Sequence, residues 1–591
     1  MNYSLTKTDI EKEKEKGVLT TAWRRLVPLM KEEGRSVALA IIAMLVSSAA
    51  TLIVPIIIAH IVDDYIADKN FHGVLLYSGL LALIFLLTLA SSYFQIKTMG
   101  GVGRRLLFNL RNKIFSKLQE LPVAFFNQNK TGDIVSRINN DTDKLNQFFS
   151  QALMQFFGNV ILIIGTGIFL LSIDFKLGLV ALLPAIVALV GTQMLSPWVK
   201  RSSLKSLRTL GGMSGEIQES INNFKVIVAF NRLDYFRNKF KEANGMNYAA
   251  SISAGIASNI FNPLYTLASS LAQLVVLAYG IYLISIGQFT VGLLIGFLLY
   301  VNNFYNPLRQ LASVWPSLQL ALAGLDRIAE ILALESNLGT EPVEKMKKSS
   351  SLEAALEFKN VNFHYEGGRD VLKNINFALE RGKTYALVGP TGGGKTTTAS
   401  LMARLYDPIA GAIFLEGKNI RCYSSDERTK KIGFILQEPF LFTGTIRENI
   451  IYGNEEYGNC TSAELAQALE KAHLTKLLSR FSEGLDTQIV SGADAISLGQ
   501  KQLIAFIRAV LRSPDILILD EATANIDTVT EQLLEEIIAK LPKKTTKVII
   551  AHRLNTIENA DEIFFVNGGE VTHAGSMQHA VELLLHGKRE S

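Results

Sequence analysis

The stretch Val388-Gly-Pro-Thr-Gly-Gly-Gly-Lys-Thr-Thr-Thr398 decides the fold of the second half of the chain. Four of its residues stand at the spacing of a phosphate-binding loop: Gly389, Gly394, Lys395 and Thr396. In such loops, glycines let backbone N–H groups turn towards phosphate oxygens. The flanking patterns fit, because 384–388 reads as a short buried strand and 397–405 as a helix whose N-terminus faces the anion. The pattern predicts an α/β nucleotide-binding domain, in preference to a chance glycine-rich turn.

The side chains of this loop have separate expected tasks with ATP and Mg²⁺. Lys395 would reach the β- and γ-phosphates, and the Thr396 hydroxyl would hold Mg²⁺. The other loop residues expected to bind ATP are Thr391, Gly392, Gly393 and Thr397, together with the glycines named above.

A second short run supplies carboxylates to the same site. Residues 516–519 are aliphatic and are followed by Asp520 and Glu521. A buried strand of this kind would deliver both carboxylates to the phosphate end of the sheet. Asp520 is expected to bind Mg²⁺ through water, and Glu521 to polarise the attacking water as a general base.

The composition points to a membrane protein. Of its 591 residues, 48% are hydrophobic, and the mean hydropathy is +0.23. A net charge of +5 gives no sign of a nucleic-acid partner. The two cysteines, Cys422 and Cys460, suit a reduced cytosolic environment and receive no role.

Long uncharged runs predict six membrane spans of about 20 residues or more. The expected spans are 36–62, 74–96, 148–173, 177–199, 252–284 and 291–314. We expect a cytoplasmic tail with an interfacial elbow helix over 1–34, a transmembrane domain over 35–334, a linker over 335–352 and an ATP-binding domain over 353–591. The fold class is thus an all-α six-helix membrane domain followed by an α/β domain.

Charge sets the expected topology. The segments 104–144 and 200–241 are long and rich in Lys and Arg, whereas the other loops are short. The positive-inside rule places these segments, both termini and the ATP-binding domain in the cytoplasm. The basic segments are amphipathic, so the helices are expected to continue beyond the membrane. Each has an interruption, 121–132 or 221–232, suited to contact with a soluble domain; the alternative is a pair of solvated loops.

With these motifs in order, the chain resembles an ABC exporter half-transporter over nearly its whole length. The resemblance implies that Tyr365 stacks on adenine and that Gln437 contacts Mg²⁺ and senses the membrane domain. It also implies that His552 touches the γ-phosphate and that Asp527 lies in a dimer-contact loop. Residues 125–143 resemble the first cytoplasmic loop of the family.

The sequence departs from the family's pattern in the signature loop, at 496–500. The family has Leu-Ser-Gly-Gly-Gln, whereas this chain has Ile-Ser-Leu-Gly-Gln. In the family this loop binds the γ-phosphate of ATP held by the opposite subunit, a role that falls here on Ser497, Leu498, Gly499 and Gln500. Leu498 is expected to crowd the approach to phosphate and to disfavour any conformation with positive φ. The alternative is a harmless variation.

The resemblance is strongest to the half of bacterial heterodimeric multidrug exporters that carries the catalytic Glu. The expected partner is a second half-transporter with a regular signature and no Glu after its Walker B Asp. The spans hold many aromatic and uncharged polar residues, which suits amphipathic compounds. A homodimer, a lipid or peptide exporter and an ATP-gated channel remain alternatives. The apolar runs exclude a soluble ABC ATPase.

One further pair of residues is a candidate for an outer gate. Asp63 and Asp64 end the first span on the expected external side. Some heterodimeric exporters resembling this chain use acidic residues there to control closing. The alternative is two solvated loop carboxylates.

Overall fold

The computed structural model describes residues 3, 5, 27–335, 354–366, 368–478, 481, 483–489, 496–520, 528–550 and 559–586. The chain forms two compact units. The helical unit comprises Thr6–Leu118 and Thr131–Ala333. The nucleotide-binding unit comprises Met1–Leu5, Gln119–Lys130 and Leu334–Ser591, and so includes a short segment from the helical half of the sequence.

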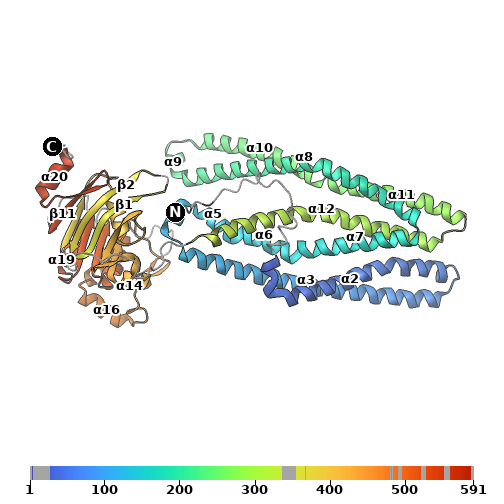
Figure 1. The fold of residues 1–591 in the computed structure, drawn as a ribbon, viewed down its shortest axis with the longest axis horizontal. Helices are drawn as coiled ribbons and strands as arrows, with labels where there is room; N and C mark the ends of the chain where they lie inside the picture. Colours follow the sequence, from blue (N-terminus) through green and yellow to red (C-terminus); the bar gives the residue numbers. More distant parts are fainter. Residues whose placement is uncertain are drawn as a thin grey trace. The chain divides into compact units, whose positions relative to one another are not determined.

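In the part of the helical unit that the structure describes, six helices are long and apolar enough to cross a membrane. They are built on α2 (Gly34–His60), α3 (Phe71–Glu120), α7 (Leu153–Ile173), α8 (Phe175–Asn222), α11 (Phe261–Ser285) and α12 (Val291–Ala333) (Figure 1). Together with the α/β domain described below, they confirm the expected fold class.

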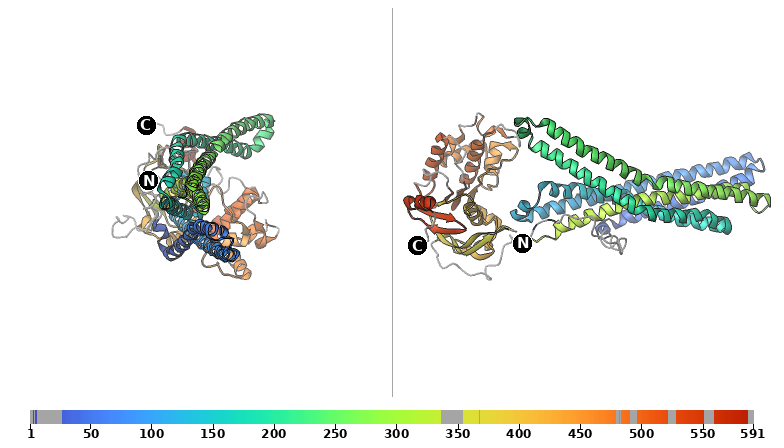
Figure 2. Two further views of the ribbon diagram at one scale, coloured as in Figure 1. Left: turned by 90° about the vertical axis from the view of Figure 1, so that its right-hand side faces the viewer. Right: turned by 90° about the horizontal axis from the view of Figure 1, so that it is seen from above.

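Several of these helices are much longer than a membrane is thick. The helices α3 and α8 run for 50 and 48 residues. At a rise of about 1.5 Å per residue, each is about 70 Å long or more. A bilayer's hydrocarbon core spans only about 30 Å, so both helices continue well beyond it. Next to α8 runs α10 (Leu233–Asn259), which leads into α11 after a break at Ile260 (Figures 1 and 2).

Shorter helical segments connect the long ones. They are η1 (Val27–Glu33), η2 (Ile61–Ile66), α4 (Val123–Gln128), α5 (Thr131–Ser136), η3 (Arg137–Asp141), α6 (Thr142–Gln147), η4 (Phe148–Ala152) and α9 (Phe224–Ala229). The two interruptions in the basic segments therefore hold the short helices α4 and α9. Of the expected elbow helix at 23–30, residues 23–26 lie outside the described residues, and 27–30 belong to η1, which is a 3-10 helix.

The helical unit has an apolar core between α7, α8, α11 and α12. It includes Leu170, Ala181, Tyr265, Phe297 and Tyr300, each no more than 3% exposed. The buried hydroxyl of Tyr300 donates to the backbone oxygen of Leu52 at 2.5 Å, so its polar atom is satisfied. Aromatic residues of the spans thus serve helix packing here.

Ion pairs of two buried residues connect η3, the segment that follows α5, with α12. Arg137 is 1% exposed and pairs with Asp133 at 3.1 Å and with Glu330 at 2.5 Å. Asp141 is fully buried and pairs with Arg327 of α12 at 3.1 Å. Removing one member of such a cluster would leave an uncompensated buried charge, so these pairs hold the two segments in one arrangement.

The nucleotide-binding unit contains two main sheets. An antiparallel sheet has the order β2-β1-β4-β5, and a six-stranded sheet has the order β12-β11-β3-β10-β9-β6, parallel except for β12. The strands are β1 (Ala354–His364), β2 (Asp370–Glu380), β3 (Thr384–Val388), β4 (Ala410–Leu415), β5 (Lys418–Asn419), β6 (Ile432–Ile435), β9 (Ile516–Asp520), β10 (Thr546–Ile550), β11 (Glu562–Asn567) and β12 (Glu570–His573); a small pair is formed by β7 (Gly444–Thr445) and β8 (Gln488–Ile489).

Helices cover these sheets and complete two apolar cores. They are α13 (Lys395–Met402), α14 (Ser425–Lys431), α15 (Ile446–Ile451), α16 (Ser462–Lys471), α17 (Thr475–Leu478), α18 (Leu498–Leu511), α19 (Thr528–Lys540) and α20 (Met577–His586), with 3-10 turns η6 (Ile420–Cys422) and η7 (Gly484–Asp486). Strand β3 spans the residues expected for it. The helix after the loop begins at Lys395 and not at Thr397, because the loop's last glycine serves as its N-cap.

Candidate ATP site

The phosphate loop connects β3 to α13 and depends on glycine. Gly389 has φ +145°, and a Cβ placed there would lie 2.0 Å from the backbone oxygen of Val566. A Cβ at Gly393 would lie 2.6 Å from the same oxygen. The loop thus presses its backbone against β11, which leaves its other side, including the exposed Thr391 and Gly392, open for a ligand.

Lys395 points into the loop. Its side chain is 5% exposed, and Nζ donates to the backbone oxygens of Gly389 at 2.8 Å and Pro390 at 3.0 Å. These neutral carbonyls satisfy a buried ammonium group. Phosphate oxygens of ATP, which carry negative charge, would be stronger acceptors for the same ammonium.

The structure brings together two of the three expected Mg²⁺ ligands. Thr396 Oγ1 donates to Asp520 Oδ1 at 3.3 Å. This contact follows from the sheet, since Leu387 and Asp520 both pair with Ile550 across β10. The exposed Gln437 lies two residues beyond β6, the parallel neighbour of β9. It therefore lies at the same carboxyl end of the parallel strands as Asp520. A hydroxyl, an amide and one carboxylate fit Mg²⁺, which prefers oxygen ligands shared with phosphates and water.

Tyr365 lies beside the phosphate-loop helix. Its hydroxyl is 3.0 Å from Thr397 Oγ1, and its ring contacts the rings of Phe363 and Tyr406 edge-on. The side chain of Tyr365 is 39% exposed, so part of its ring remains available for stacking. Burial raises the pKa of the Tyr406 phenol.

The signature loop forms the N-terminus of α18. Ser497 caps the helix: its Oγ accepts from the Gln500 backbone N–H at 3.2 Å, and Gln500 Oε1 accepts from the Ser497 backbone N–H at 3.0 Å. Leu498 is the first helical residue, and its side chain is 42% exposed. Neither Leu498 nor Gly499 is among the residues with positive φ, so the backbone here does not adopt the conformation that a leucine disfavours. The other effect expected of Leu498 is steric and comes from the bulk of its side chain.

Three expected functional residues lie outside the described residues. They are Glu521, which directly follows β9, His552, which follows β10 by two positions, and Asp527. Their roles therefore stay predictions from the sequence.

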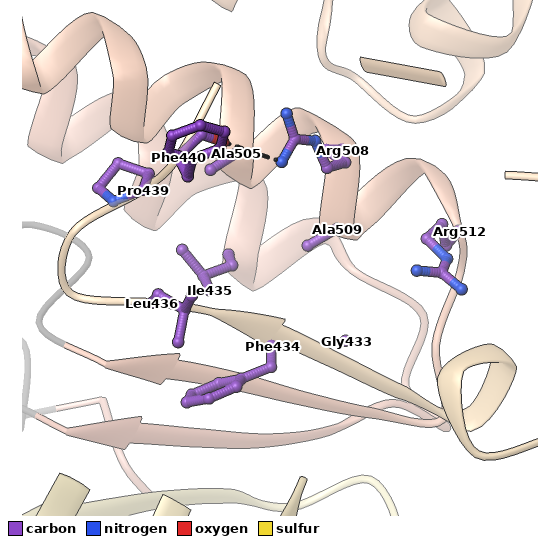
Figure 3. A pocket seen from close by; sticks show the side chains of 10 residues that line it. All are labelled: Gly433, Phe434, Ile435, Leu436, Pro439, Phe440, Ala505, Arg508, Ala509 and Arg512. Carbon is purple, nitrogen blue, oxygen red and sulfur yellow. Dashed lines mark hydrogen bonds between the residues drawn. The ribbon is translucent and has the colours of Figure 1, made fainter. Parts of the chain in front are cut away.

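A cavity of about 100 Å³ lies between β6 and α18 (Figure 3). Its lining includes Phe434, Leu436, Phe440, Ala505, Arg508 and Arg512. Arg508 donates to the backbone oxygens of Asn449 at 2.7 Å and Phe440 at 3.2 Å, and burial lowers the pKa of its guanidinium. Arg508 thus ties the segment after Gln437 to the helix that carries the signature loop, a link that the sequence does not reveal.

Sequence reasoning also missed contacts made by α4. Asn127 Nδ2 donates to the Tyr406 hydroxyl at 2.5 Å, and Gln128 Nε2 donates to Glu366 Oε2 at 3.3 Å. Both side chains therefore contact residues around Tyr365. In the sequence, the interruption at 121–132 predicts contact with a soluble domain. It does not show which residues make that contact.

The gate candidates have partners within the helical unit. Asp63 Oδ1 accepts from the Gly292 backbone N–H at 2.7 Å, and Asp63 Oδ2 accepts from the Thr290 hydroxyl at 2.5 Å. Asp64 pairs with His60, one turn before it. The structure thus joins Asp63 to the N-terminus of α12.

Known protein families match both the helical half and the nucleotide-binding half of this chain. Residues 37–308 match the family of the ABC transporter transmembrane region, and 372–524 match the ABC transporter family of ATP-binding domains. The Bacillus subtilis (strain 168) protein "Uncharacterized ABC transporter ATP-binding protein YfiC" is 32% identical over 567 residues, 95% of this chain and 91% of that protein. A Lactococcus lactis subsp. lactis (strain IL1403) "Multidrug resistance ABC transporter ATP-binding and permease protein" is 30% identical, covering 96% of this chain and 95% of its own length.

A solved structure has the same fold throughout. It is the "Structure of a bacterial Atm1-family ABC exporter with ATP bound", with 25% sequence identity, a TM-score of 0.78 and coverage of 94% of this chain and 99% of that one. The six apolar helices, the complete phosphate loop and these relatives lead to one conclusion. The chain belongs to the ABC transporters, as an exporter half-transporter that joins a transmembrane region to a domain hydrolysing ATP.

Proposed function

We propose that this chain is one half of a heterodimeric exporter of amphipathic compounds, with its ATP-binding domain and both termini in the cytoplasm. ATP binding would close the two nucleotide-binding domains, the long helices would carry that motion to the membrane, and hydrolysis would reset the cycle. The relative from Lactococcus lactis named for multidrug resistance supports this substrate class. The basic segments 104–144 and 200–241 support the orientation.

The heterodimer is supported chiefly by Leu498. This side chain stands half-exposed at the first residue of α18, where the backbone of a helix N-terminus would otherwise approach phosphate closely. In a homodimer such a loop would face both ATP molecules. In a heterodimer it would face only the ATP of the partner, and the ATP bound by this chain would meet a regular signature.

The ATP site of this chain has the parts that hydrolysis requires. Lys395 would turn from its carbonyls to the β- and γ-phosphates, while Tyr365 would stack on adenine. Mg²⁺ held by Thr396, Asp520 and Gln437 would offset the phosphate charge. Glu521 would take the proton of the attacking water, and His552 would contact the γ-phosphate.

The membrane helices carry uncharged polar groups among their apolar residues. Gln273 Nε2 on α11 donates to Asn302 Oδ1 on α12 at 2.8 Å. The uncharged runs of the spans supply no buried counter-ion, which favours amphipathic cargo over strongly charged cargo.

The test is to purify this chain alone and together with a second half-transporter that has a regular signature and no Glu after its Walker B Asp. We expect ATPase activity stimulated by amphipathic drugs only from the pair. Full drug-stimulated activity from this chain alone would contradict the heterodimer, and Leu498 would then be a tolerated variant.

A further inference from the structure

The first residues of the chain are held in the nucleotide-binding unit. Tyr3 is 3% exposed and Leu5 is 8% exposed. Their binding partners lie around the C-terminal end of α4. This is the helix whose Asn127 donates to Tyr406 beside the ATP site.

Asn129, directly after α4, binds the backbone at both buried positions. Its Oδ1 accepts from the Leu5 N–H at 2.9 Å, and its Nδ2 donates to the Tyr3 backbone oxygen at 2.9 Å. A side-chain amide has the donor and acceptor of a peptide group, so Asn129 pairs with this segment as a neighbouring strand would. The second hydrogen of Nδ2 goes to the backbone oxygen of Phe125 at 2.7 Å, which fixes the amide against α4.

Gln128 connects the same segment to the ATP site. Its Oε1 accepts from the Tyr3 N–H at 2.8 Å, while its Nε2 donates to Glu366, the residue after Tyr365. Tyr3 also donates its hydroxyl hydrogen to the backbone oxygen of Glu335 at 3.2 Å, two residues beyond the end of α12. The N-terminal residues therefore join three parts of the chain: α4, the start of the linker and the edge of the adenine site.

We propose that Tyr3 and Leu5 bind α4 as an intramolecular ligand. By doing so, these two residues fasten α4 to the ATP-binding domain and to the start of the linker. When the segment is docked, Gln128 and Asn129 are both satisfied, and α4 moves with the ATP-binding domain. When it is released, α4 is held by fewer contacts. The proposal rests on the proposed function only in treating α4 as part of the path that carries motion towards the membrane.

The test is hydrogen exchange measured by mass spectrometry on the full chain assembled with its partner in lipid nanodiscs. The variants Asn129→Ala and Tyr3→Ala remove the two sides of the docking site, and Lys130→Ala is the control at the neighbouring exposed position. We expect the amides of residues 3 and 5 to exchange at least tenfold faster in the first two variants than in the unmodified protein or the control. Equal rates in all four proteins would overturn the docking.

A second measurement follows the peptide spanning α4 in the same samples, with and without ATP and vanadate. Tyr3→Ala leaves α4 itself unaltered, so faster exchange of this peptide in Tyr3→Ala than in Lys130→Ala would show that the segment holds the helix. Unchanged exchange of α4, with the amides of residues 3 and 5 freed, would overturn the fastening role. Neither measurement uses a transport substrate. Failure of the substrate assignment would appear instead as missing drug stimulation in the assembled pair.

Discussion

The phosphate loop and the signature loop each place a helix N-terminus where a phosphate could bind, yet they prepare it differently. The phosphate-loop helix α13 has Gly394 as its N-cap, with φ +111° and no side chain to cap the first turn. The signature helix α18 has Ser497 as its N-cap, whose side chain accepts from the Gln500 N–H, and its first residue is the half-exposed Leu498. In the proposed heterodimer these two loops would face different ATP molecules, so one site could be strong while the other is weakened.

The largest expected effect lies on the phosphate-loop side. Glu521→Gln removes the proposed general base, which contributes about 10²–10⁴-fold, or roughly 3–5 kcal/mol of barrier. ATPase turnover of the assembled transporter should fall by that factor while ATP still binds. The control is Glu536→Gln, an exposed acid on α19. Near-normal turnover in Glu521→Gln would show that Glu521 is not the general base. The site at this chain's phosphate loop would then have no demonstrated catalytic advantage over the site that its signature loop faces.

The next effect tests the backbone of the phosphate loop. Gly389→Ala adds a Cβ that would lie 2.0 Å from the Val566 backbone oxygen, so the loop must shift. Gly392→Ala is the control, because the backbone there has φ +80° but, apart from its chain neighbours, no atom of the described residues lies within 4 Å of the added Cβ. Positive φ alone costs a non-glycine residue about 1–3 kcal/mol. We expect ATP affinity to fall at least tenfold in Gly389→Ala and less in Gly392→Ala, measured by titration of nucleotide binding. Equal losses would show that strain, and not the contact with β11, limits the loop.

A third helix N-terminus, in the helical unit, extends the comparison. Asp63 accepts from the Gly292 N–H at the start of α12, as a capping carboxylate would. Loss of such a cap costs about 1 kcal/mol, or roughly a fivefold shift in a two-state equilibrium. Asp63→Ala should shift the inward/outward balance under ATP trapping by about that factor, read from spin-label distances. Asp63→Asn keeps an acceptor and should shift it less, and Asp64→Ala should act weakly because its pair with His60 is exposed. An unchanged distance distribution in Asp63→Ala would favour two merely structural carboxylates.

Local patterns were enough to predict the elements that surround the site. An aliphatic run predicts a buried strand wherever it occurs, and the runs at 384–388 and 516–519 correspond to β3 and β9. The contacts that hold the site in place were not predictable in this way. The bonds from Asn127 to Tyr406 and from Arg508 to Phe440 join residues 279 and 68 positions apart, and nothing in the local sequence of either partner specifies the other. At Leu498 the local sequence could not show whether the loop needs positive φ, because that depends on where the helix begins.

The smallest expected effect belongs to the residue that distinguishes the two loops. Leu498→Gly restores Ser-Gly-Gly-Gln, the last four residues of the family's signature, and removes the exposed side chain at the start of α18. If this loop faces the partner's ATP, and the partner lacks a catalytic Glu, the site it completes hydrolyses little whatever its shape. Total ATPase turnover of the heterodimer should therefore change by less than about threefold, far below the effect of Glu521→Gln. Leu498→Met keeps the bulk and serves as the matched control. The affected property should be nucleotide retention: labelled ATP should dissociate more slowly from the partner's site in Leu498→Gly than in Leu498→Met, because the backbone of the helix N-terminus can then approach the phosphate. A rise in turnover of tenfold or more in Leu498→Gly would mean that the loop faces a hydrolysing site, and the assignment of unequal sites would have to be abandoned.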